Sequence, residues 1–144
     1  MKIERMTEAH LDAVAELERE CFAHPWSRES LKETLRSGDS LFYVAEVDGR
    51  VIGYIGMSYV LDEGYIYNVA VEKSSRKKGA GSALIQTLVN YGKKNGFAFI
   101  TLEVRESNTA ARSLYSSFGF IKVGERKKYY SDPVDNAVLM TLYF

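Results

Sequence analysis

A basic turn with two glycines, residues 74–84, is the part of the chain best suited to bind a ligand. A strand-like apolar run, residues 65–71, precedes it, and a helix-like run, residues 82–94, follows. In this order, backbone N–H groups and the positive end of a helix dipole point at one spot, which suits a phosphate. Glycines let the ligand come close to the backbone. The cations of this stretch are Lys73, Arg76, Lys77 and Lys78.

Two common phosphate motifs differ from this turn. A P-loop has four residues between its glycines and then Lys-Ser/Thr, whereas one residue separates Gly79 from Gly81. A dinucleotide fingerprint needs Gly or Ala where Leu84 stands, although Glu103 follows at about the right distance for its acidic residue. An ordinary connection with solvated lysines is the remaining alternative.

Glu103 is a candidate general base. It ends a strand-like run of mostly apolar residues, so its carboxylate would be partly withdrawn from water and usable as a base near neutral pH. The alternative is a strand end that emerges into water, where Glu103 pairs with Arg105 or a lysine.

Tyr115 is a candidate proton donor. On a helix over residues 109–118, Leu114 and Phe118 are expected to face the sheet, and Tyr115 falls on another side. A phenol there could donate a proton, or it could be a half-buried tyrosine that caps a loop.

No metal site is expected. The two histidines lie near helix ends and have no metal-ligand spacing to each other or to Cys21. As the single cysteine, Cys21 cannot form an internal disulfide, and its helical pattern indicates a small core residue rather than a nucleophile.

The composition is that of one soluble domain spanning residues 1–144, with 46% apolar and 26% charged residues. The formal net charge is zero, so nothing global indicates nucleic acid or membrane as a partner. No apolar run approaches a membrane span, and the N-terminus lacks a signal-peptide core. These features favour a reducing cytoplasm.

The surrounding elements must position these residues. Periodicity predicts helices that begin after Thr7 and end near Phe22, and over residues 28–36, 82–94 and 109–118. Strands are predicted over residues 2–6, 41–47, 50–60, 65–71, 97–104, 118–127 and 136–144. The run 97–104 is apolar on both faces and is therefore expected to be a buried central strand.

The order of these elements limits the fold. Asp48-Gly49 indicates a two-residue hairpin, so the three strands from residue 41 to residue 71 form an antiparallel meander. One βαβ crossover follows, from residue 65 to residue 103, whereas a dinucleotide-binding fold needs several in series. We therefore expect an α/β (α+β) domain with a mixed sheet of about seven strands and about four helices.

The chain resembles a known family. Residues 76–81, Arg-Lys-Lys-Gly-Ala-Gly, match the Arg/Gln-x-x-Gly-x-Gly/Ala signature of the GNAT N-acetyltransferase superfamily, and they follow a Val-Ala-Val strand as in that family. Four stretches are similar to its ribosomal-protein alanine N-acetyltransferase (RimI-type) branch, and the resemblance as a whole extends over essentially the entire chain. They are residues 22–27, residues 61–63 with 67–71, residues 102–108 through 114–115, and residues 129–130 with 135–140. Ser74-Ser75 depart from the pattern, where an aromatic residue often precedes the arginine.

The resemblance implies a GNAT acyl-CoA N-acyltransferase fold with acetyl-CoA as co-substrate and no metal. Pantetheine would bind the backbone of Val69 and Val71 where two parallel strands splay, and pyrophosphate would bind the amides of residues 77–82. By family pattern Glu103 is the general base and Tyr115 the general acid. The implied cofactor-binding residues are Val69, Ala70, Val71, Arg76, Lys77, Lys78, Gly79, Ala80, Gly81, Ser82 and Asn108.

The resemblance also implies an acceptor, the N-terminal alanine of a small-subunit ribosomal protein. Its groove is expected to involve Trp26, Glu63 and Tyr130. Two alternatives remain, because a fold does not choose its acceptor. One is acetylation of a small-molecule amine or a lysine side chain, and the other is a non-catalytic acyl-CoA-binding module.

Overall fold

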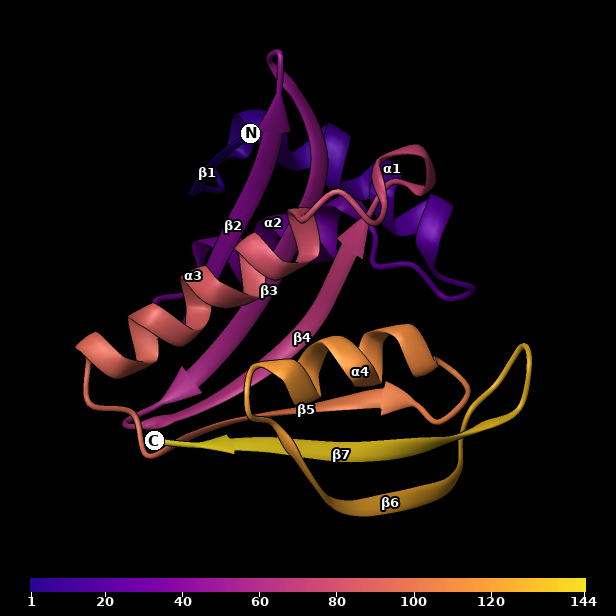
Figure 1. Ribbon diagram of the computed structural model, residues 1–144. Helices are drawn as coiled ribbons and strands as arrows, with labels where there is room; N and C mark the ends of the chain where they lie inside the picture. Colours follow the sequence, from indigo (N-terminus) through magenta and orange to yellow (C-terminus); the bar gives the residue numbers. More distant parts are fainter.

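A mixed sheet of seven strands, in the order β1-β2-β3-β4-β5-β7-β6, forms the framework of the protein (Figure 1). The computed structural model describes all residues, Met1–Phe144. Neighbouring strands are antiparallel except for β4 and β5, which are parallel. The strands are β1 (Lys2–Arg5), β2 (Ser40–Val47), β3 (Arg50–Val60), β4 (Glu63–Val71), β5 (Phe99–Arg105), β6 (Ile121–Tyr130) and β7 (Asp135–Tyr143). The mixed sheet with one parallel pair confirms the predicted fold class.

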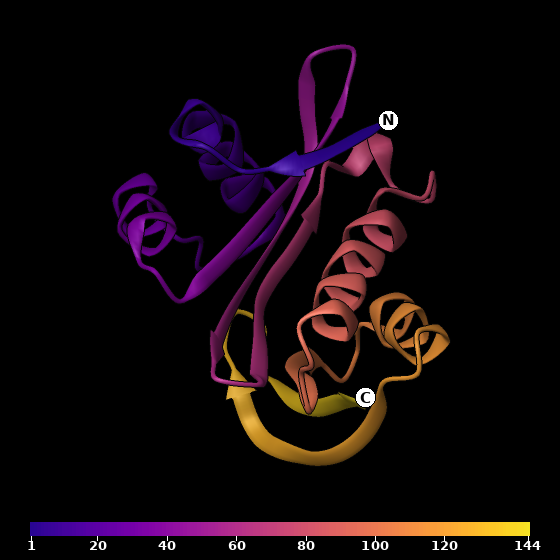
Figure 2. The same cartoon turned by 90° about the vertical axis from the view of Figure 1, so that its left-hand side faces the viewer.

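Four α-helices cover the two faces of this sheet, as Figure 2 shows: α1 and α2 lie on one face, and α3 and α4 on the other. The helices, with two short 3₁₀ turns, are η1 (Glu8–His10), α1 (Leu11–Cys21), α2 (Arg28–Arg36), η2 (Lys73–Ser75), α3 (Ala80–Lys94) and α4 (Thr109–Ser117). None of them combines the length and the apolar character that crossing a bilayer requires.

Each face of the sheet has its own hydrophobic core. The larger core, 19 buried residues, is closed by α3 and α4, and the smaller one, 10 buried residues, by α1 and α2. Leu41 and Phe42 enter different cores because successive strand residues point to opposite faces. No residue of β5, β6 or β7 belongs to the smaller core. On the α1/α2 side, the face of β5 is therefore left available for a binding site.

Local sequence signals account for the connections near the site. Asp48 and Gly49 adopt positive φ angles of 51° and 76°, as a tight hairpin turn requires, and β2 and β3 pair on either side of them. The side chain of Ser27 accepts a hydrogen bond from the Ser30 N–H at 3.1 Å and begins α2 at the predicted residue.

Several element ends differ from the prediction because pairing partners, not local pattern, decide where a strand ends. Strand β4 begins at Glu63, opposite Phe99 of β5, so Glu63 lies on a strand and not in a turn. Strand β6 continues to Tyr130, opposite Asp135, so Tyr130 ends a strand and does not lie in a loop. By contrast, helix α1 ends at Cys21, next to the predicted end near Phe22.

Strand β4 carries a β-bulge. Gly56 of β3 lies opposite Asn68 and Met57 lies opposite Ile66, so Tyr67 is the extra residue. As a result two successive residues face α1: Tyr67 packs against the smaller core, and Asn68 bonds to Glu18 of α1. Gly56 is needed here, since an added Cβ would lie 2.4 Å from the Phe42 ring.

The parallel strands β4 and β5 pair over a short distance only. Their register runs from Glu63–Phe99 to Tyr65–Thr101, and the strands then diverge, as Figure 1 shows. The splay implied by the family resemblance is thus present. It opens the sheet immediately before the bulge.

Candidate active site

A cavity of about 650 Å³ lies where β4 and β5 diverge. Its walls come from the bulge of β4, the end of β5, α4, the α1–α2 loop and the β6–β7 loop. It brings together six of the residues singled out in the sequence, which are Trp26, Val69, Glu103, Asn108, Tyr115 and Tyr130. Glu63 lies outside it, at the exposed start of β4, so the structure does not place Glu63 with the other candidate acceptor residues.

Glu103 faces this cavity. In β5 the side chains of Ile100, Leu102 and Val104 are buried in the larger core, while Glu103 points to the opposite face and is only partly buried. The strand is therefore apolar and fully packed on one face only, and not on both as expected. The uncovered face is the one that opens to the cavity.

The two carboxylate oxygens of Glu103 have different environments. Tyr65 donates its hydroxyl hydrogen to Oε1 at 3.2 Å. Oε2 is enclosed yet has no hydrogen-bond partner; the nearest cation, Nε of Arg126, lies 3.5 Å away without hydrogen-bonding geometry. A buried acceptor without a partner costs about 1–3 kcal/mol, and such atoms call for an explanation, a catalytic role being one. This oxygen is free to accept a further hydrogen bond.

The phenols around Glu103 remain protonated. Burial, and secondly the charge of Glu103, raises the pKa of Tyr130 to about 12. The same two causes, in the same order, raise the pKa of Tyr65 well above its usual range. The guanidinium of Arg105 lies over the Tyr130 ring, 4.6 Å from its centroid, and holds that ring at the cavity edge. Both hydroxyls can therefore act as hydrogen-bond donors toward the carboxylate or a ligand.

Tyr115 is more deeply buried than the sequence predicted. It belongs to the larger core and packs on Phe120, whereas Leu114 and Phe118, the predicted inward-facing residues, are only partly buried. Leu114 and Phe118 do pack against the larger core as predicted, but Tyr115, which the prediction placed on another side of the helix, is buried in that core as well. Burial raises the pKa of Tyr115, so the phenol keeps its proton at neutral pH.

Asn108 begins α4 at the cavity wall. Its side-chain oxygen accepts a hydrogen bond from the Ala111 N–H at 3.1 Å, which is an ordinary helix cap. Its proposed contact with a cofactor would add to this structural role.

Where β5 has diverged from it, β4 has a free edge, and the backbone N–H and C=O groups of every second residue point toward the gap between the two strands. Glu72 donates its N–H to Ile52 on β3, and the direction of bonding alternates along an antiparallel pair. The backbone groups of Val69 and Val71 therefore face the gap, whereas those of Ala70 face β3. The side chain of Ala70 is buried in the smaller core. Of the three predicted residues, the structure places Val69 and Val71 at the edge but not Ala70.

The basic turn follows this edge. Lys77 and Gly79 have φ angles of 62° and 91°, which turn the chain tightly before α3. The first hydrogen bond of the helix runs from Ala83 N to Gly79 O at 3.0 Å, so the preceding N–H groups lack helical partners. Such a concave set of amides is a ready anion site. Arg76, however, turns back: its Nε donates to the Val71 carbonyl at 3.0 Å.

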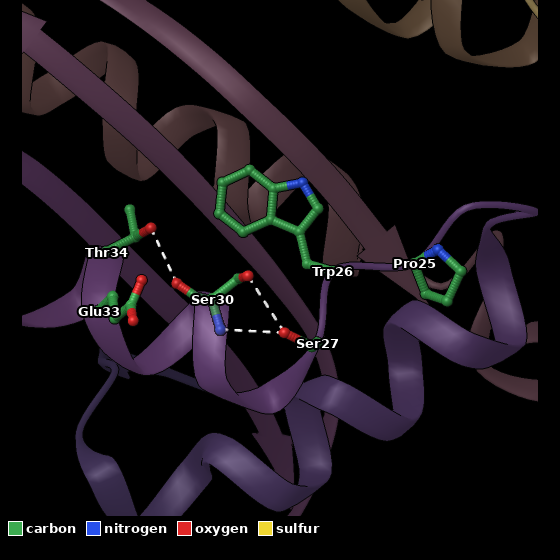
Figure 3. A pocket seen from close by; sticks show the side chains of 6 residues that line it. All are labelled: Pro25, Trp26, Ser27, Ser30, Glu33 and Thr34. Atoms are coloured by element: carbon green, nitrogen blue, oxygen red, sulfur yellow. Dashed lines mark hydrogen bonds between the residues drawn. The ribbon is translucent and has the colours of Figure 1, made fainter.

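A second hollow, of about 530 Å³, lies beside Trp26 at the start of α2 (Figure 3). Its hydroxyl groups are already used within the helix, since Ser27 caps Ser30 and Thr34 donates to the Ser30 carbonyl at 2.9 Å. Figure 3 shows these bonds among the lining residues. The first cavity, with the unpartnered Glu103 oxygen, is the better candidate site.

Three further side chains gather near the β1 edge of the sheet. Glu4, His10 and Glu46 have ligand atoms within 4.8 Å of one another, a cluster that the sequence did not reveal. Nδ1 of His10 accepts the Thr7 N–H at 2.9 Å, which leaves Nε2 as the donor to Glu46 at 3.0 Å. The imidazole is thus engaged at both nitrogens.

The residues that sequence reasoning missed are Tyr65, Arg126 and Glu18. Tyr65 and Arg126 contact Glu103, and Glu18 bonds to two cavity-lining residues. Their positions depend on strand register and helix docking, so a single sequence contains no signal for them.

Comparison with known proteins agrees with this geometry. The acetyltransferase (GNAT) family model matches residues 11–120. An uncharacterized N-acetyltransferase of Methanocaldococcus jannaschii is 41% identical over 97% of this chain and 90% of its own length. A putative ribosomal protein bS18-alanine N-acetyltransferase of Bacillus subtilis is 35% identical over 90% of this chain and 87% of its own.

Among solved structures, the ribosomal-protein-S18-alanine N-acetyltransferase of Escherichia coli superimposes with a TM-score of 0.92 at 31% identity. The match covers 99% of this chain and 92% of that one. Sequence, fold and the splayed strand pair thus agree, and the chain belongs to the GNAT family as an acetyl-CoA-dependent, RimI-like N-acetyltransferase.

Proposed function

We propose that this enzyme transfers an acetyl group from acetyl-CoA to the α-amine of a protein N-terminus, without a covalent enzyme intermediate. The observation that carries the proposal is the enclosed, unpartnered Oε2 of Glu103 in a cavity also lined by Tyr115. An α-amine has a pKa of about 7.7–8.0, so a fraction is already neutral at physiological pH. From the fraction that is still protonated, Glu103 removes the ammonium proton, directly or through a water molecule.

The chain offers groups that fit acetyl-CoA. The backbone groups of Val69 and the N–H of Val71 can pair with the amides of the pantetheine arm, while the Val71 carbonyl already accepts from Arg76 and Cys21. The turn before α3 can bind the pyrophosphate. Acetyl-CoA supplies the thioester carbonyl carbon that the amine attacks. The N–H of Val69 is suited to stabilise the charge that develops on the thioester oxygen.

Tyr115 completes the proton balance. Where the amine was protonated, the proton that Glu103 took from it has first passed to water. The neutral amine nitrogen then forms the new amide bond as the carbon–sulfur bond breaks, and the proton that the nitrogen loses in this step goes to Glu103. The buried phenol, protonated because its pKa is raised, donates to the departing CoA sulfur. Exchange with water returns both side chains to their starting states.

We further propose the N-terminal alanine of a small-subunit ribosomal protein as the acceptor. The names of the Bacillus subtilis and Escherichia coli relatives support this assignment. Trp26, on the α1–α2 loop, and Tyr130, at the end of β6, would form the sides of the acceptor groove. Such an acceptor would place the reaction in the cytoplasm.

Mass spectrometry of peptides incubated with enzyme and acetyl-CoA tests this function. A series of peptides that differ in the first residue is compared with N-terminally blocked peptides that contain lysine and with small amines. We expect acetylation at the α-amine, highest with alanine first. Acetylation only of lysine side chains, whose pKa is about 10.4 and which need a more basic catalyst, would overturn the proposal. Preferred acetylation of a small amine would do so as well.

A further inference from the structure

Glu18 of α1 is a wholly buried carboxylate that the proposed mechanism does not use. No lysine, arginine or histidine forms an ion pair with it; its partners are three neutral donors. Oε1 accepts the Trp26 N–H at 2.8 Å, and Oε2 accepts the Tyr54 hydroxyl at 2.6 Å and Nδ2 of Asn68 at 3.2 Å. Burying a charge is costly even when it is hydrogen-bonded, and an apolar side chain would fill this space at lower cost.

The partners of Glu18 suggest why it is charged. Trp26 belongs to the α1–α2 loop and Asn68 to the bulge of β4, and both line the catalytic cavity. One carboxylate therefore joins the loop that forms the acceptor wall to the strand that borders the gap. Tyr54, the third partner, lies in the smaller core and outside the cavity.

A series of contacts between side chains connects the α1–α2 loop to the Glu103 carboxylate. The Trp26 ring packs on Tyr67, with centroids 5.1 Å apart, and Tyr67 meets the edge of Tyr65 at 5.9 Å. Tyr65 donates to Oε1 of Glu103 at 3.2 Å. A displacement of Trp26 would thus disturb both the acceptor wall and the tyrosine that orients Glu103.

Phe22 and Trp26 of the same loop also pack against the smaller core, but the loop has few other polar contacts. Its other polar contact links His24 to Asp132 and Ser131 of the β6–β7 loop, and His24 and Asp132 are largely exposed. Exposed pairs contribute little to stability. Glu18 is therefore the buried polar anchor of the loop.

We propose that Glu18 is a positioning residue, which fixes the α1–α2 loop and Trp26 on the β4 bulge so that the acceptor groove is formed before the acceptor binds. This inference rests on the proposed function in one respect, that the acceptor enters the cavity past Trp26. The role is in acceptor binding, and the acetyl-CoA edge at Val69 and Val71 is not part of it.

The test compares Glu18→Gln with Tyr54→Phe. Glutamine keeps the shape but has one acceptor oxygen, so it cannot accept from both Trp26 and Asn68 as the carboxylate does. We expect the acceptor KM to rise about 10- to 100-fold, the effect of losing one or two hydrogen bonds to a charged group. The KM for acetyl-CoA should stay near that of the parent. Tyr54→Phe removes a donor to the same carboxylate but keeps the bonds to Trp26 and Asn68, so it should raise the acceptor KM much less than Glu18→Gln and leave the KM for acetyl-CoA near the parent.

Trp26 is the only tryptophan, so its fluorescence reports on the loop without any acceptor. We expect stronger acrylamide quenching in Glu18→Gln than in the parent or Tyr54→Phe. Parent-like quenching and parent-like acceptor KM, or an equal rise of both KM values, would overturn the inference. If Glu18→Gln does not fold, Glu18→Asp, which is charged but shorter, is measured in the same way; unfolding of both would assign Glu18 a purely structural role.

The two proposals can fail separately. If the parent acetylates a lysine or a small amine instead of an N-terminus, the proposed function fails. The quenching comparison still decides the role of Glu18 in that case, because it needs no acceptor.

Discussion

Glu103 has one oxygen that accepts a hydrogen bond from a tyrosine and one that has no hydrogen-bond partner and lies 3.5 Å from the Arg126 guanidinium. At the scale of single residues this asymmetry is informative, since it orients the carboxylate while leaving a lone pair for a substrate proton. Sequence reasoning reached Glu103 and Tyr115 as candidates, but it could not separate them from structural residues. Only the tertiary structure shows that one oxygen of Glu103 is enclosed and that Glu103 and Tyr115 line the same cavity.

Glu103→Gln tests the base. Glutamine can still accept the hydrogen bond from Tyr65 but cannot take a proton, so we expect kcat to fall about 10²–10⁴-fold with acetyl-CoA binding retained. Turnover across the pH range and calorimetric binding of acetyl-CoA provide the measurements. Glu63→Gln, the same change outside the cavity, should leave kcat unchanged. Near-normal turnover of Glu103→Gln at all pH values would remove Glu103 from this role.

Tyr115→Phe tests the acid. Phenylalanine still packs on Phe120, so the fold should persist while protonation of the leaving sulfur loses its donor. We expect CoA release, followed with a thiol reagent, to slow by about 10²-fold or more. Tyr143→Phe, at an exposed position, is the control. An unchanged rate for Tyr115→Phe would make Tyr115 a structural residue only.

Protonation of Glu18 should contribute to the pH dependence of the free energy of unfolding. Burial raises the pKa of Glu18 in the folded protein, with hydrogen bonds opposing that shift, so the native state binds more protons at this group than the unfolded chain. Its contribution to stability therefore falls as pH rises from about 4.3, the unfolded pKa, through the higher folded pKa. Urea unfolding from pH 4 upward should show Glu18→Gln gaining stability relative to the parent over this window. A constant difference would contradict this.

At the scale of elements, the turn before α3 was the element that the sequence predicted most directly. Strand, glycine-containing turn and helix follow one another locally, and the turn has the left-handed residues that such an anion site needs. The bulge near the end of β4 could not be predicted in this way. The bulge at Tyr67 is set by the register between β3 and β4, next to Gly56 of β3, which makes room for the Phe42 ring of β2.

Gly79→Ala tests the turn. At φ +91° an alanine is strained by about 1–3 kcal/mol, so the turn should distort and acetyl-CoA should bind more weakly. Thermal unfolding and acetyl-CoA titration measure the two effects. Gly38→Ala, at a glycine with open space and no such φ, should be neutral or slightly stabilising. Full acetyl-CoA affinity in Gly79→Ala would argue against this turn as the pyrophosphate site.

At the scale of the whole molecule, two parts of the sheet meet at the short β4–β5 ladder. A ligand that pairs with the free edge of β4 and binds at the α3 turn would join these parts and stabilise only the folded state. With acetyl-CoA at 100 times its Kd we expect about 2.7 kcal/mol of added stability. Thermal unfolding should shift upward by several degrees, and adenosine alone should have a smaller effect. No shift with acetyl-CoA would contradict binding in this gap.

By itself the sequence determined what depends on near neighbours along the chain: the Asp48-Gly49 hairpin, the Ser27 cap, the glycine turn before α3, and an element order that allows one parallel pair. These features are fixed by backbone sterics and periodicity within a few residues. Only the tertiary structure decided what depends on register and docking. It placed Glu63 outside the cavity, turned Tyr115 into the core, and brought Tyr65 to Glu103 and Glu18 to Trp26. The physical reason is that contacts between distant segments depend on how strands pair and helices pack, and a one-residue shift in either would place different side chains at the site.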